Sequence, residues 1–169
     1  MKKTVAFIIL IVLIVVVGTI YYQNSSDVGV KIDRLKLKHA ITSNSTPESL
    51  MSFSNELGAI KTEAGLESNL VSFEKNYWGS VSLNKKGANF LTRREGLFGI
   101  ECGKDQDFDS VVAAMNNSKT YLDSATALYS EVRDEYTVKD QEDWDLRLKS
   151  LDSSILVNSN LLFTICPIN

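Results

Sequence analysis

The apolar residues are distributed differently in the three parts of this chain. They form an unbroken run at the start, an irregular pattern in the middle and two regular stripes at the end. The initial run covers residues 4–20, and Lys2 and Lys3 stand directly before it. A helix rises about 1.5 Å per residue, so residues 4–22 are long enough to cross a hydrocarbon core of about 30 Å. We therefore expect residues 1–22 to form an uncleaved signal anchor, a single transmembrane helix.

A cleaved signal peptide is the alternative interpretation of this run. Such peptides have a basic start, an apolar stretch and a cleavage site of small residues, for which residues 16–18 are acceptable. Against cleavage, the apolar run continues past that site and ends at Tyr21 and Tyr22, as interfacial aromatic residues do. The basic start predicts that the N-terminus stays inside the cytoplasmic membrane and that the remaining domain lies outside it, in a periplasmic or extracellular location.

The last third of the chain has apolar or small residues at every third or fourth position, in two stretches joined by a short polar connection. This pattern predicts an antiparallel helical hairpin over residues 109–136 and 140–165, with Asp109 as a helix cap. Ser118 and Asn158 interrupt the stripes. We expect them to form a local polar pair; the alternatives are that they set the register of the hairpin or face a small cavity.

Helical spacing also runs through residues 47–77. Thr46, Pro47 and the acid that follows them are typical of a helix start. The apolar positions change phase at Gly65, so either the helix breaks there or its buried face rotates. The two sets of apolar positions are Leu50, Phe53, Leu57 and Ile60, followed by Leu66, Leu70, Phe73 and Tyr77.

Residues 23–46 are interpreted as a membrane-proximal segment and linker. Periodicity does not decide between helix and strand for residues 28–35. Basic residues are frequent here, and we interpret them as the solvated face of a stalk, with contact to anionic headgroups as the alternative. The only histidine, His39, is expected to face solvent. The basic residues are Lys31, Arg34, Lys36 and Lys38.

Glycine and positive charge are concentrated in residues 78–108, which hold five of the nine glycines. We therefore expect an irregular, glycine-rich basic connection inside a helical domain that spans residues 47–169. Its glycines match no phosphate-binding fingerprint. If an anion or a partner binds this domain, the expected contacts are Lys85, Lys86, Arg93 and Arg94.

Cys102 and Cys166 are the only cysteines. In the predicted hairpin, residue 166 lies beside residue 110, and Cys102 is a short loop away. An even count outside the cytoplasm favours a disulfide, worth about 4 kcal/mol in the chain-entropy model. A redox pair or metal site is disfavoured, because there is no CxxC motif and only one histidine.

No pattern in the sequence predicts catalysis, and no cofactor or metal is expected. The acids around Glu135 and Asp140 are interpreted as helix-terminal residues at a solvated turn, with an acid–base pair as the alternative. The net charge of −3 argues against nucleic-acid binding. Possible glycosylation sites, in the predicted exterior part, are Asn24, Asn44 and Asn116.

These observations predict an all-α protein in which a transmembrane helix precedes an extracytoplasmic helical bundle. The function that fits best is a non-enzymatic accessory subunit of an envelope or membrane complex. It would contact lipid through residues 4–22 and a partner protein through the exterior domain. The alternatives are a ligand-sensing bundle that binds a small anion, and a secreted helical protein if the N-terminus is cleaved.

Overall fold

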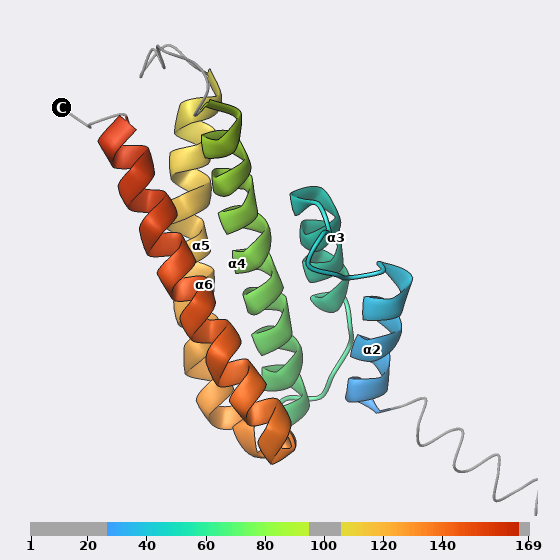
Figure 1. Ribbon diagram of the computed structural model, residues 1–169. Helices are drawn as coiled ribbons and strands as arrows, with labels where there is room; N and C mark the ends of the chain where they lie inside the picture. Colours follow the sequence, from blue (N-terminus) through green and yellow to red (C-terminus); the bar gives the residue numbers. More distant parts are fainter. Residues whose placement is uncertain (1–26, 95–105, 166–169) are drawn as a thin grey trace, which may run out of the picture.

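Three long helices lie side by side and alternate in direction in the computed structural model, which describes residues 27–94 and 106–165 (Figure 1). Within these residues all regular structure is helical, and two short helices lie to one side of the first long helix. The all-α prediction is therefore confirmed. The elements are α2 (Val28–Lys38), α3 (Pro47–Leu57), α4 (Leu66–Arg94), α5 (Gln106–Val132), the 3-10 turn η1 (Arg133–Glu135) and α6 (Val138–Ile165).

Helices α5 and α6 confirm the predicted C-terminal hairpin. The cap at Asp109 is wrong, because α5 already begins at Gln106. Helix α6 is capped by Thr137, whose hydroxyl accepts from the backbone N–H of Asp140 over 3.3 Å and donates to the Asp140 carboxylate over 2.6 Å. The buried stripes include Val111, Met115, Leu122, Ala125, Tyr129 and Val132 on α5, and Trp144, Leu148, Leu151, Ile155 and Leu162 on α6.

Aromatic rings fill the core at the end of the bundle where α5 turns into α6. Trp144 of α6 lies with its ring centroid 4.8 Å from that of Phe73 and 4.8 Å from that of Tyr77, both on α4. Tyr129 of α5 lies 5.3 Å from Phe73. Such pairs add about 0.5–1.5 kcal/mol each to the burial of their surface, so this cluster joins all three long helices.

The structure contradicts the predicted glycine-rich connection over residues 78–108, because α4 continues without a break to Arg94. Residues 95–105 lie outside the described part. At Gly87 a neighbouring helix comes too close for a side chain, and at Gly79 it leaves only a tight fit. A Cβ at Gly87 would overlap the sulfur of Met115 on α5, and one at Gly79 would lie 3.2 Å from the hydroxyl of Ser54 on α3.

Polar side chains join α4 to the hairpin. Ser80 donates to the carbonyl oxygen of Ser118 over 2.8 Å, and Ser118 donates to the carbonyl oxygen of Ser80 over 2.9 Å. Further along, Asn158 donates to Asn84, which donates to Ser154, each over 2.9 Å. Ser118 and Asn158, which interrupt the two stripes, therefore both bond to α4. They do not form the predicted pair with each other.

Of the two alternatives for the change of phase at Gly65, a break or a rotated face, the structure shows the break: α3 ends at Leu57 and α4 begins at Leu66. Gly65 has a φ of 117°, in the left-handed region that glycine adopts readily, and α4 begins at the next residue. The predicted start of α3 is also confirmed, because the hydroxyl of Thr46 accepts from the N–H of Ser49 over 3.3 Å.

The stalk interpretation of residues 28–38 is wrong. Helix α2 packs onto α3 and α4 through Val28 and Ile32, which are each 3% exposed. They share a small core with Phe53, Leu57 and Val71. Because Val28 and Ile32 bury one side of the helix against the bundle, α2 is not a free solvated rod despite its basic residues.

None of the helices within the described residues combines the length and the apolar character needed to cross a bilayer. The predicted transmembrane segment, residues 4–22, lies outside the described part.

Candidate interaction surface

Two of the basic residues predicted to contact an anion, Lys85 and Lys86, bond to different parts of the fold. Lys85 donates to the carbonyl oxygens of Ser43 and Ser45, each over 2.7 Å, and so holds the α2–α3 loop against α4. Lys86 turns to α5, where it donates to the hydroxyl of Ser110 over 2.8 Å. Both ammonium groups therefore have partners within the fold, which leaves the anion-sensing alternative without a geometric basis at these two residues.

The remaining predicted site residues are spread over the chain. Arg93 and Arg94 are in the last turn of α4. Asn44 and Asn116 are exposed, in the α2–α3 loop and on α5 respectively, so both sequons remain open predictions. Three residues lie outside the described part, and the disulfide therefore also stays a prediction: Cys102, Cys166 and Asn24.

The solvent-facing position predicted for His39 is wrong. Its side chain is 13% exposed and its Nε2 lies 3.1 Å from the carboxylate of Glu56. Its ring packs against Phe53, with centroids 5.7 Å apart. Lys38 lies 2.7 Å from the same carboxylate, and its hydrogen bond holds the pKa of Glu56 below the ordinary value. His39 is largely covered because it ends α2, where the chain turns back onto α3.

The acidic residues around the α5–α6 turn mostly have structural roles. Glu131 accepts from the side-chain amide of Asn69 over 2.7 Å, which fastens the end of α5 to the start of α4. Asp140 belongs to the cap of α6. These contacts match the interpretation of the acids as helix-terminal residues.

The most prominent unpartnered surface is on α6. In its C-terminal half, four large apolar side chains are exposed on the two flanks of the buried stripe of Ile155 and Leu162, with the exposed Asn160 and Thr164 between them. Helices that face water usually present charged or polar residues there. We call this surface the α6 outer face and define it by Leu156 (61% exposed), Val157 (55%), Leu161 (43%) and Phe163 (38%).

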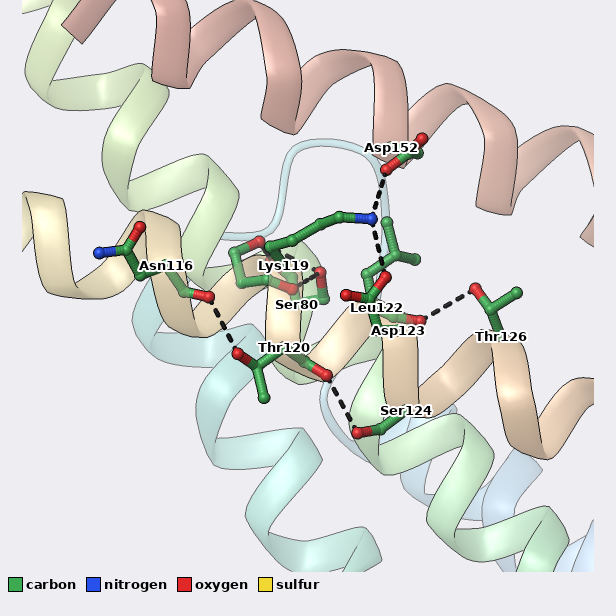
Figure 2. A network of polar contacts seen from close by, with 10 residues as sticks. Ser80, Asn116, Lys119, Thr120, Leu122, Asp123, Ser124, Thr126 and Asp152 are labelled. Carbon is green, nitrogen blue, oxygen red and sulfur yellow. Dashed lines mark hydrogen bonds and ion pairs between the residues drawn. The ribbon is translucent and has the colours of Figure 1, made fainter. Parts of the chain in front are cut away.

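Charge is absent along this surface. Asp152 is the last charged residue of the chain, and the polar residues that follow it are uncharged. Lys119 of α5 lies 3.0 Å from Asp152 and 2.7 Å from Asp123 (Figure 2). The hydrogen bonds that Lys119 donates to Asp123 and Asp152 raise the pKa of its ammonium group. This network joins α6 to α5. It lies at the point along α6 where the charged residues end and the α6 outer face begins.

Sequence reasoning did not identify the α6 outer face. We used the periodic stripe to assign the core and gave no role to the apolar residues between its positions. The sequence does contain a sign of this surface: apolar residues lie outside the buried stripe in a stretch that has no charged residue after Asp152.

Comparisons with protein-family models, with curated proteins and with solved structures found no match to this chain.

Proposed function

We propose that this protein is a non-enzymatic, single-pass membrane-anchored helical domain that acts through protein–protein contacts. Residues 4–22 anchor it in the cytoplasmic membrane, with the N-terminus inside and the helical bundle outside. Its role is that of an accessory subunit in a cell-envelope or membrane complex. The apolar run and its preceding lysines support the anchor.

The observation that supports a contact role is the α6 outer face. Exposed apolar side chains that are concentrated on one short stretch of helix, and not scattered singly over the surface, favour an interaction site. Each of the four defining side chains is more than a third exposed. Because the surface has no charge, the partner it fits is an apolar helix or groove of another protein.

Substitution of the α6 outer face tests this function. Leu156→Lys and Val157→Lys place a charge where a partner would bury apolar surface. We expect both to release the protein from its complex, measured by native mass spectrometry of the full chain in mild detergent. Stability should change little, since exposed substitutions usually stay within about 0.5 kcal/mol.

Ala127→Lys on the exposed side of α5 is the matched control, and it should leave the complex intact. If wild-type protein from its native membrane is strictly monomeric, the proposed function is wrong. Sequencing the N-terminus of the mature protein distinguishes the anchored form from the secreted one, because only cleavage removes residues 1–18.

A further inference from the structure

Helix α2 has an outer side that its packing on α3 and α4 leaves free. A helix turns by about 100° per residue, so Leu37 points away from the buried Val28 and Ile32. Leu37 is 80% exposed, the largest exposed fraction of any large apolar side chain in the described residues. The half-exposed Val30 lies on the same side, two turns earlier.

Basic side chains form a row beside Leu37. Lys31, Arg34 and Lys38 follow one another at spacings of three and four residues, so they share one side of α2. Lys38 pairs with the carboxylate of Glu56, whereas Lys31 and Arg34 have no ion pair within the residues that the structure describes. The row therefore offers two free cations next to an exposed apolar side chain.

The acids near this row already have partners. Asp27 caps the start of the helix by accepting from a backbone N–H over 2.7 Å, and Asp33 lies 4.0 Å from Lys36. Glu56 already holds Lys38 over 2.7 Å. No direct contact therefore compensates the two free cations of the row within the described residues.

The position of α2 in the chain brings this outer side close to the membrane. In the proposed anchored form, residues 23–27 join α2 to the end of the transmembrane segment. Five residues extend over about 18 Å at most, so α2 stays near the lipid headgroups. Figure 1 shows α2 at the outer edge of the molecule, with α3 and α4 between it and α5. Its outer side is therefore free to meet a flat surface.

The same tether favours a lipid surface over a dissolved anion. A tethered segment meets the surface at a high effective concentration, so weak attraction is enough to hold it there. Each Lys or Arg beside an anionic lipid surface strengthens such binding about fivefold. An apolar side chain among these cations enters the boundary between headgroups and acyl chains, as in helices that lie on membranes. A free phosphate ion would use the cations but leave Leu37 in water.

We propose that α2 lies on the outer surface of the membrane that holds the anchor, with Leu37 at the level of the headgroups and Lys31 and Arg34 bound to the phosphates of anionic lipids. This inference rests on the anchor of the proposed function. It adds that the bundle turns its α2 side towards the membrane.

Fluorescence quenching of the full chain in vesicles tests this contact. A fluorescent amino acid replaces Leu37 or, as the control, Ser124 on the exposed side of α5, and lipids with a nitroxide on the headgroup quench it. We expect strong quenching at position 37 in vesicles of phosphatidylcholine mixed with phosphatidylglycerol, and weaker quenching in phosphatidylcholine alone. The probe at position 124 should be quenched little in both.

Neutralising one free cation tests the role of charge. Arg34→Gln should lower the ratio of quenched to unquenched probe at position 37 about fivefold in the anionic vesicles and leave it unchanged in phosphatidylcholine. Lys31→Gln is a second variant with the same expected result. Lys149→Gln, on the exposed side of α6, is the matched control and should have no effect. Circular dichroism checks that each variant is folded.

A carbonate wash of the vesicles separates this inference from the anchor on which it rests. Protein that the wash removes would contradict the anchor, and with it the proposed function. If the protein stays but the probe at position 37 is quenched no more than the probe at position 124, the α2 contact alone is overturned. Equal quenching in the two lipids, or an equal loss with Lys149→Gln, would overturn it as well.

Discussion

Two ion pairs of α2 show how burial changes the contribution of the same chemical contact. Lys36 lies 2.8 Å from Glu74, and Lys38 lies 2.7 Å from Glu56. The side chain of Glu74 is 3% exposed, whereas that of Glu56 is 37% exposed. Loss of the lysine leaves an uncompensated buried charge in the first pair and a hydrated one in the second.

We therefore predict different losses of stability for two matched substitutions. Lys36→Met should lower the free energy of unfolding by about 2–3 kcal/mol, somewhat less than for a fully buried pair because Lys36 is 30% exposed. Lys38→Met should lower it far less, because this ion pair is exposed and screened by solvent. Urea denaturation followed by circular dichroism measures both, and equal losses would show that Glu74 is not held as described.

At the scale of elements, apolar periodicity predicts a helix correctly where that helix buries one continuous stripe of apolar residues. The hairpin of α5 and α6 and the start of α3 at Thr46 follow from spacing and capping residues alone. The full length of helix α4 does not follow from the local pattern, because glycines such as Gly79 and Gly87 are typical of loops. Their role depends on Ser54 and Met115, which are distant in sequence, so the local pattern contains no sign of it.

The packing role of Gly87 can be tested directly. Gly87→Val should lower the free energy of unfolding by about 1–3 kcal/mol through overpacking against Met115, although valine is the better helix former. Ala88→Val, at the next and half-exposed position, controls for helix propensity. Equal effects of the two substitutions in thermal unfolding would mean that α4 and α5 are not in close contact at Gly87.

The candidate surfaces and the buried polar side chains were less predictable than the elements. Glu74 is one acid in a helix rich in polar residues, and its burial results from α2, which precedes it by more than thirty residues. Tyr136 was assigned to the hairpin stripe, and its lack of a hydrogen-bond partner is a property of the assembled fold. In both cases, segments distant in the sequence pack around the side chain. A local apolar pattern does not show which segments will meet, so it does not predict these environments.

At the scale of the whole molecule, the predicted disulfide between Cys102 and Cys166 stays a prediction that a direct measurement can test. Helix α6 ends near the end of the bundle where α4 ends and α5 begins (Figure 1). Cys166 directly follows α6, and Cys102 lies between α4 and α5 in the sequence. We expect a mobility shift between reducing and non-reducing gels and no alkylation of the unreduced protein. Two freely alkylated thiols in the native protein would contradict the bridge.

The central claim is that the protein works by presenting the α6 outer face to a partner. Photo-cross-linking in intact membranes tests it most directly, with a photoreactive residue placed at Val157 or Leu161 and, as controls, at the exposed Ala113 and Ser130 of α5. We predict a light-dependent adduct of one discrete mass from the two α6 positions and none from the controls. Adducts only at the α5 positions, or at none of the four, would contradict the claim.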